Sequence, residues 1–196
     1  MDKLEGVDEK AILMKEWELY EPAKLKKPSK IFVCSTIELF HPEVKFNTGA
    51  IFNVIKENPQ HTFQILTKFP QNIDRPMPNN VWLGITITGN NHEDFLRASE
   101  FGFRKRKAKI QFVSYEPLFE EPVQNIPHVD WIIIGRLTGH GKRFDPRLEW
   151  IKKIVRSCAD NGTRVFLKNN LKEIWGEPLI QEFPDRCQKL LSTEED

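Results

Sequence analysis

Six polar side chains lie at or just after the ends of short apolar runs, and their types suit the binding of a small charged molecule. They are Glu38, Lys68, Thr86, Glu116, Arg136 and Lys168. The clearest is Glu116, which ends the run that begins at Ile110 and is followed by Pro117. Because proline has no N–H for a sheet ladder, a strand must finish at this carboxylate. Functional groups of α/β proteins gather at such strand ends.

The elements that would position these side chains are short apolar runs separated by turn residues. Each run has the length and composition of a buried parallel strand. We predict strands over residues 31–36, 61–67, 81–88, 110–116, 130–137 and 164–169. About six strands alternating with helices require parallel pairing and right-handed crossovers, which leaves an open doubly wound sheet or a (β/α) barrel.

Three segments between the strands are predicted to be helices. In "NTGAIFNVIKENP", Ile51, Val54 and Ile55 have helical spacing. The segment "NNHEDFLRASEFG" has Asn90 or Asn91 as its cap and Phe95 and Leu96 on its inner side. In "DPRLEWIKKIVRSCADNG", we expect Asp145 to be the N-cap, Pro146 to be the first helical residue and Gly162 to stop the helix.

The alternation of side chains in "VWLGITIT" favours the barrel over the open sheet. One phase, from Val81 to Ile87, is wholly apolar, whereas the other, from Trp82 to Thr88, becomes polar toward the strand end. A barrel strand has an apolar outer face against helices and an inner face that is polar at the mouth. Both faces of a strand in a doubly wound sheet would be apolar. The predicted fold is therefore an incomplete (β/α) barrel.

At the mouth of such a barrel, Lys68, Arg136 and Lys168 would balance Glu38 and Glu116. This ring of charges could hold an anionic or zwitterionic ligand. A structural ion pair that caps a loop is the alternative for Glu116. Lys168 has three alternatives: binding a phosphate or carboxylate, forming a Schiff base, or lying solvated at the rim.

Two further motifs could contact phosphates. The loop "GRLTGHGKR" is rich in glycine and basic residues, but it has no phosphate-loop spacing, so a plain loop is the alternative. The run "FRKRKAK" includes Arg104, Lys105, Arg106 and Lys107 and could contact a nucleic-acid backbone. A solvated loop is the simpler interpretation of one short basic run in a chain of net charge +1.

The rest of the composition gives no metal or membrane signal. The three cysteines, Cys34, Cys158 and Cys187, form no CxxC pair, and the histidines form no HxH or HExxH motif. No apolar run approaches the roughly 20 residues that a membrane span needs. The start of the chain does not have the pattern of a signal peptide, so we expect a cytoplasmic protein. We divide the chain into a helical segment 1–30 that covers a barrel edge, a partial barrel 31–176 and a tail 177–196.

The strand-end motifs, read in order, resemble a known family. They are "KLKKPSKIFVCSTIELFHPEV", "PQHTFQILTKFP", "NNVWLGITITG", "IQFVSYEPLFEE", "DWIIIGRLTGHGKR" and "RVFLKNNL". Together they are similar to the phage gene product thirty-seven/sixty-eight type family. This resemblance implies a (β/α) barrel of the radical S-adenosylmethionine type. Relatives carry a three-cysteine segment near the N-terminus that is thought to bind a 4Fe-4S cluster.

This sequence departs from that pattern because residues 1–30 contain no cysteine. "GRLTG" also stands where many relatives read closer to GGESG, so a carboxylate is missing at Leu137. We therefore expect a fragment or shortened relative with no cofactor of its own, while a longer form would use S-adenosylmethionine and a 4Fe-4S cluster. Its open edges would be covered by the N-terminal helix, by a missing segment or by a second subunit in a homo-oligomer.

Two functional hypotheses follow. The first is a truncated or shortened protein that resembles radical S-adenosylmethionine enzymes and has a pocket for an unknown small molecule at the carboxyl ends of the strands. The second is a non-catalytic barrel that binds a nucleotide or nucleic acid through Lys68, Arg136, Lys142 and the basic run at 104–109. Binding of nucleic acid would weaken steeply with salt.

Overall fold

The fold is built on one curled parallel sheet, as described by a computed structural model that covers residues 15–44, 48–89, 91–103, 108–122 and 128–184. The strands are adjacent in chain order, each pairing in parallel with the next. They are β1 (Lys30–Phe32), β2 (Thr62–Thr67), β3 (Val81–Ile87), β4 (Ile110–Tyr115), β5 (Trp131–Ile134) and β6 (Arg164–Leu167). The predicted incomplete barrel is confirmed.

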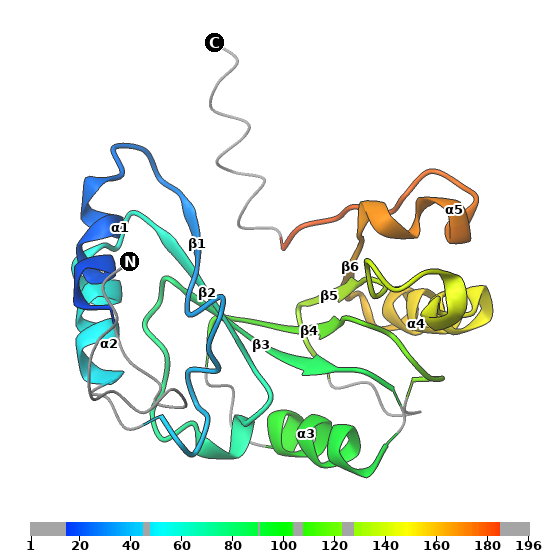
Figure 1. The fold of residues 1–196 in the computed structure, drawn as a ribbon, viewed down its shortest axis with the longest axis horizontal. Helices are drawn as coiled ribbons and strands as arrows, with labels where there is room; N and C mark the ends of the chain where they lie inside the picture. Colours follow the sequence, from blue (N-terminus) through cyan, green and yellow to red (C-terminus); the bar gives the residue numbers. More distant parts are fainter. Residues whose placement is uncertain (1–14, 45–47, 90, 104–107, 123–127, 185–196) are drawn as a thin grey trace.

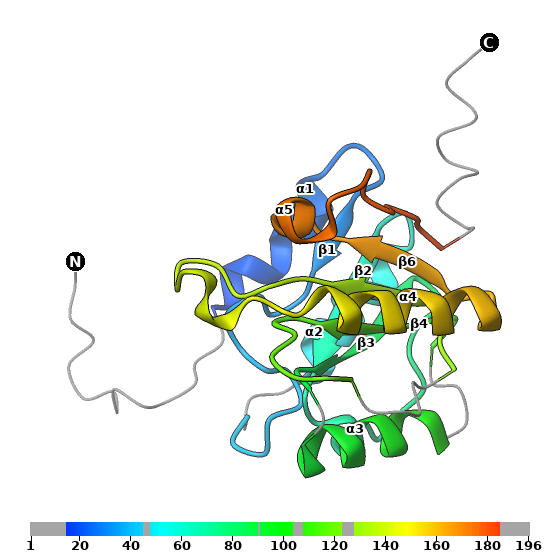
Figure 2. The ribbon, with the colours of Figure 1, turned by 90° about the vertical axis from the view of Figure 1, so that its right-hand side faces the viewer.

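Helices line the convex side of this sheet. The longer ones are α2 (Thr48–Glu57), α3 (His92–Phe103) and α4 (Leu148–Asn161), and Figure 1 shows them spaced around the outside of the curve. The short ones are η1 (Glu16–Tyr20), α1 (Glu21–Lys24), η2 (Pro70–Asn72), η3 (Lys142–Phe144), η4 (Asn169–Leu171) and α5 (Lys172–Trp175). In Figure 1, α1 and α5 lie at opposite ends of the sheet, although they overlap in Figure 2. Among the described residues, no helix is long and apolar enough to cross a membrane.

The two phases of β3 meet two different cores, and the apolar phase faces the helices, as the sequence pattern predicts. Val81, Leu83, Ile85 and Ile87 are completely buried and belong to the large, mainly aliphatic core that the convex-side helices cover. The alternate residue Trp82 belongs to a second cluster on the concave side. β3 is therefore buried on both faces, by helices on the convex side and by aromatic side chains on the concave side.

The concave cluster is aromatic, and we call it the aromatic cluster. It consists of Trp82, Phe112, Trp131, Phe166 and Phe183, whose neighbouring rings have centroids 5.2–6.0 Å apart. The Trp131 indole N–H donates a hydrogen bond of 2.8 Å to the carbonyl of Glu182. These rings lie on the concave side over β3 to β6, whereas Phe32 of β1, which shares their phase, is 46% exposed.

The free edge of β6 is covered by the chain that follows α5. The Leu167 N–H donates to the Ile180 carbonyl at 2.7 Å, and the Glu182 N–H donates to the Val165 carbonyl at 2.8 Å. Residues 177–184, expected to be a tail, thus run along the sheet. Pairing of this kind removes an edge that would otherwise be open to aggregation.

The opposite edge is formed by β1, which pairs only with β2 within the described part of the chain. The N-terminal turns beside it are fixed by His61. This imidazole accepts a hydrogen bond from the Ser29 N–H at Nδ1 (3.1 Å), and its Nε2 therefore carries the proton that faces the Pro22 carbonyl at 3.0 Å. In η1, Leu19 packs against the core, whereas Trp17 is 65% exposed.

Several predicted element boundaries are wrong. The fifth strand ends at Ile134 instead of residue 137. The first strand ends at Phe32 instead of residue 36, because the chain turns at Cys34, which has a positive φ of 54°. The last long helix begins at Leu148, with Arg147 and not Asp145 as its N-cap. Pro146 holds Asp145 in an extended conformation, with φ −69° and ψ 135°, as proline does to the residue before it. The predicted stop is correct, since Gly162 is left-handed with φ 67°.

The inner side of α3 also differs from the prediction. Phe95 and Leu96, expected inside, are 51% and 48% exposed. Ala98, Phe101 and the carboxylate Asp94 are buried instead. The hydrogen bonds of Asp94, described below, fix the rotation of this helix about its axis, and they outweigh the burial of the two apolar side chains.

Candidate ligand site at the carboxyl edge of the sheet

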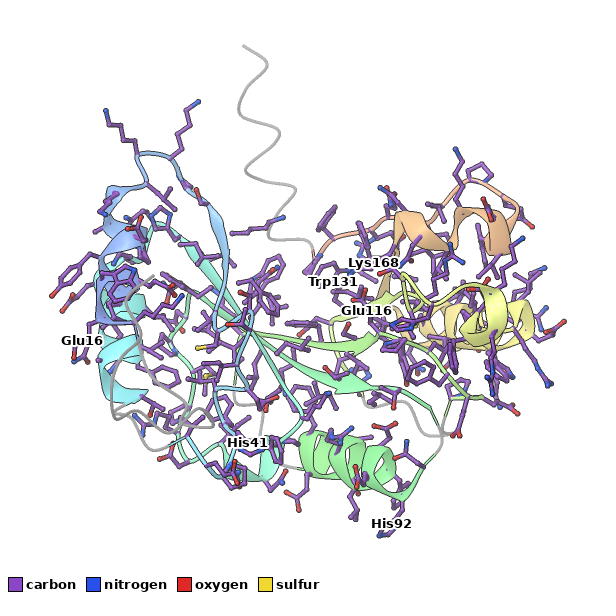
Figure 3. The ribbon with its side chains drawn as sticks, viewed as in Figure 1. Glu16, His41, His92, Glu116, Trp131 and Lys168 are labelled. Carbon is purple, nitrogen blue, oxygen red and sulfur yellow. The ribbon has the colours of Figure 1, made fainter. Side chains whose placement is uncertain are left out.

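Glu116 and Lys168 form an ion pair at the carboxyl edge of the sheet (Figure 3). Glu116 directly follows β4 and Lys168 directly follows β6, so that β5 lies between them. Two strand spacings amount to roughly 9.6 Å. The side chains meet because Gly135, at the end of β5, has no side chain to separate them. The two side chains are 30% and 41% exposed, which leaves both charges accessible to a ligand.

Gly135 allows this pairing by steric means. A Cβ at this position would lie 2.9 Å from Lys168 Cδ and 3.0 Å from Glu116 Oε1. Gly135→Ala is therefore expected to separate the pair while the sheet stays folded, because both side chains can bend away. A double-mutant cycle with Glu116→Gln and Lys168→Met should give a coupling free energy of about 0.5–1 kcal/mol in the wild type. In the Gly135→Ala background it should be near zero, and an unchanged coupling would contradict this account.

Glu38 and Lys68 are also brought together, but through the backbone of Lys68. Glu38 Oε2 accepts a 2.8 Å hydrogen bond from the Lys68 N–H, and Oε1 accepts a 3.4 Å one from the Phe40 N–H. The carboxylate thus ties the turn after β1 to the end of β2. The Lys68 side chain is exposed. Glu38 here acts as a connector between two loops.

Thr86 lies deeper, opposite Ser114 in the register of β3 and β4. Its side chain is buried, and its carbonyl accepts a 3.3 Å hydrogen bond from Arg97 Nη1. Arg97 Nε also donates to the Lys68 carbonyl at 2.9 Å. This arginine on α3 therefore joins the ends of β2 and β3, a role the sequence analysis did not assign to it.

Asp94 is a second residue that sequence reasoning missed. Its carboxylate is fully buried, and Oδ2 accepts four hydrogen bonds of 2.9 Å, from the N–H and hydroxyl of Thr88, the N–H of Gly89 and the side-chain amide of Asn91. Oδ1 pairs with Arg97. An acidic residue in the first turn of the helix that follows a strand was the available signal. Asp94 holds the β3–α3 loop in place.

Arg136 is directed away from the Glu116–Lys168 pair. It comes one residue after Gly135, so its side chain points to the opposite face of the sheet from the pair. Its Nη1 contacts both carboxylate oxygens of Asp145, at 2.8 and 3.1 Å. The Asn170 side chain holds its backbone, accepting from the Arg136 N–H at 3.4 Å and donating to its carbonyl at 3.0 Å. The predicted ring of charges is therefore divided into three separate groups of hydrogen bonds and ion pairs, which are centred on Glu38, Glu116 and Arg136.

A small cavity of about 210 Å³ lies in the glycine-rich loop after β5. Its lining includes Arg136, Gly139, Gly141 and Lys142. Both glycines have positive φ, 83° and 68°, and a side chain at either would meet open space. The Nε of Arg136 is buried without a partner among the described residues. The basic run Arg104, Lys105, Arg106 and Lys107 lies outside the described residues.

The described residues do not fit an iron–sulfur cluster. They contain two cysteines, Cys34 after β1 and Cys158 on α4, and no group of three or more His, Cys, Asp or Glu side chains that could hold a metal ion. Cluster ligands are thiolates. Burial raises the pKa of the Cys34 thiol, with the carboxylates of Glu38 and Glu18 adding to it, and burial raises the pKa of Cys158 to about 12. Both thiols are therefore held protonated.

Fold and site together define a class, namely an incomplete α/β barrel with an ion pair at the carboxyl edge of its sheet. Comparison with protein families gives a match over residues 2–189 to a family described as protein of unknown function, DUF5131. The chain belongs to this family. Searches among curated proteins and among solved structures gave no match.

Proposed function

We propose that the carboxyl edge of this half-barrel binds a small zwitterionic molecule of the S-adenosylmethionine type. Lys168 would receive the carboxylate of the ligand and Glu116 its ammonium group. The observation that carries this proposal is the Glu116–Lys168 pair held over Gly135. A zwitterion carries one negative and one positive group. Its carboxylate can take the place of Glu116 beside Lys168, and its ammonium group can take the place of Lys168 beside Glu116. The sequence resemblance supports the choice of ligand class.

The surroundings of the pair suit this role. Both side chains remain partly exposed, so that a ligand need not displace a buried ion pair, which would be costly. Ser114, Ile133 and Phe166 lie side by side in the register of β4, β5 and β6, just below the pair on the concave side. They provide a floor of mixed polarity that continues into the aromatic cluster through Phe166. The proposed activity is binding.

The experiment is titration calorimetry with S-adenosylmethionine, S-adenosylhomocysteine and methionine. Glu116→Gln is expected to weaken binding of S-adenosylmethionine about tenfold, because the ammonium loses its charged partner. Its melting temperature should stay close to that of the wild type, because an exposed pair contributes little to stability.

Glu121→Gln is the matched control. It removes the same charge from another ion pair, with Lys153, in which the Glu121 side chain is 55% exposed and the Lys153 side chain 44%. This control should bind as the wild type does. Absence of binding by any of the three ligands would reject the proposal. So would a Glu116→Gln variant that melts early yet binds normally, since the carboxylate would then be structural.

A second candidate function rests on the loop cavity. The unpartnered Nε of Arg136, together with Lys142 and two open glycines, suits a phosphate of a nucleotide or nucleic acid. We propose testing it with a fluorescent oligonucleotide at several salt concentrations. Affinity should fall steeply with salt and fall further in Lys142→Gln. A flat salt response would remove this candidate.

A further inference from the structure

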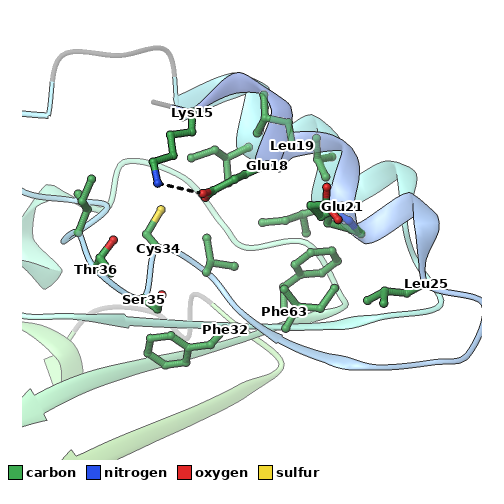
Figure 4. Close-up of a pocket in the computed structure, with 17 residues that line it drawn as sticks. Lys15, Glu18, Leu19, Glu21, Leu25, Phe32, Cys34, Ser35, Thr36 and Phe63 are labelled. Carbon is green, nitrogen blue, oxygen red and sulfur yellow. Dashed lines mark ion pairs between the residues drawn. The ribbon is translucent and has the colours of Figure 1, made fainter. Parts of the chain in front are cut away.

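A second pocket lies far from the Glu116–Lys168 pair, beside the free edge of β1 (Figure 4). We call it the edge pocket. Its walls are β1 with the turn that follows, the short helices η1 and α1, and α2, and Phe63 of β2 also lines it. The His61 hydrogen bonds described above fix the N-terminal wall to the start of β2. The pocket is thus formed by anchored elements.

The size and lining of the edge pocket suit a small organic molecule. Its volume is about 560 Å³, within the range of about 300–1,000 Å³ for ligand pockets. Most of its lining is apolar, and the aliphatic part includes Leu19, Leu25, Ile31, Val33, Ile37 and Val54. None of these six side chains is fully buried, so each would lose further contact with water when a ligand binds.

One end of the edge pocket is polar and lies in a negative field. Figure 4 shows that this end is lined by Lys15, Glu18, Cys34, Ser35 and Thr36. Besides burial, the carboxylates of Glu38 and Glu18 raise the pKa of the Cys34 thiol, as expected where negative charge surrounds an acid. Lys15 Nζ already lies 3.6 Å from Glu18 Oε1, so an ammonium group on an aliphatic chain fits there.

We propose that the edge pocket binds an amphipathic amine, that is, a molecule with an aliphatic body and one ammonium group. The body packs against the aliphatic side chains of η1, of β1 and the turn after it, and of α2. The ammonium group takes the place of Lys15 beside Glu18. Ser35 and Thr36 offer hydroxyl oxygens at the same end. This site is independent of the proposed function at Glu116 and Lys168, and either can fail without the other.

The test compares three probes of equal chain length, decylamine, decanol and decanoate, each below its micelle concentration. Their binding is followed by displacement of the neutral fluorescent probe N-phenyl-1-naphthylamine. Decylamine should bind roughly threefold to tenfold more tightly than decanol, and decanoate should be the weakest. Glu18→Gln should remove most of the preference for the amine and leave decanol unchanged. Glu16→Gln, on the same helical turn but outside the lining, is the matched control.

Two variants fill the edge pocket directly. Val54→Trp places a large side chain on the α2 wall, and Leu25→Trp does so from an exposed position where folding is less at risk. Both should abolish displacement by all three probes while the melting temperature stays near that of the wild type. Equal binding of decanoate and decylamine would overturn the proposal. So would a dimer that binds no probe and dissociates in Leu25→Trp, since a second copy would then occupy the pocket.

Discussion

Asp94→Ala is expected to lower the free energy of unfolding by about 3–5 kcal/mol, because it leaves a largely buried arginine and several buried donors without their acceptor. The Asp94 carboxylate accepts from two backbone N–H groups, a hydroxyl and an amide, and it pairs with Arg97. The Arg97 side chain is only 14% exposed. Urea unfolding followed by circular dichroism measures the change.

Glu93→Ala is the control for this prediction. Glu93 lies one residue earlier in the same turn of α3 and contacts the same arginine at 3.5 Å, but its side chain is 83% exposed. Its loss should cost less than about 1 kcal/mol. Equal effects of the two substitutions would mean that Asp94 acts only as a surface charge near a helix N-terminus.

Gly84→Ala is expected to destabilise the protein by about 1–3 kcal/mol through overpacking. A Cβ on Gly84 would lie 2.4 Å from two atoms of the Phe112 ring. That ring is buried and packs against Trp131 at a centroid distance of 5.8 Å, so it has little room to move. Thermal unfolding should show a lower melting temperature and weaker near-ultraviolet signals from the aromatic cluster.

The second variant for this prediction is Phe112→Leu. Alone it should destabilise the protein by removing ring contacts, but it also makes room for a methyl group at position 84. The Gly84→Ala, Phe112→Leu pair should therefore be more stable than the sum of the single effects predicts. Simple additivity would show that the methyl group is accommodated elsewhere.

The fold could be predicted from the sequence because the pattern repeats and is local. Each strand is an apolar run bounded by turn residues, and the phase that starts at Val81 faces the convex-side core as expected. The predicted ends of strands and helices were wrong where the backbone conformation of a single residue determines where the element ends. The left-handed Cys34 ends β1 early, and Pro146 delays the start of α4. Neither effect is visible in the periodicity of hydrophobic residues.

The candidate site was less predictable because its geometry depends on residues far apart in the chain. Alternation places Glu116 and Lys168 at one edge, but their contact requires that Gly135 lie between them. Arg136 was assigned to the same ring, yet one step along the strand turns it toward Asp145. The buried role of Asp94 depends on donors from a loop whose conformation no local pattern specifies. The roles of these residues in ligand binding remain predictions.

The consecutive order of the six strands has a consequence for folding during synthesis on the ribosome. Each strand pairs with the one synthesised just before it, so every new segment meets a finished template as it emerges. No early strand has to wait for a distant partner, and chain closure for each pairing spans only one loop and helix. At each stage the strand added last forms the exposed edge of the sheet, until residues 180–182 pair with β6 and cover it. The N-terminal half of the sheet can therefore be assembled before the residues that pair with β6 have been translated.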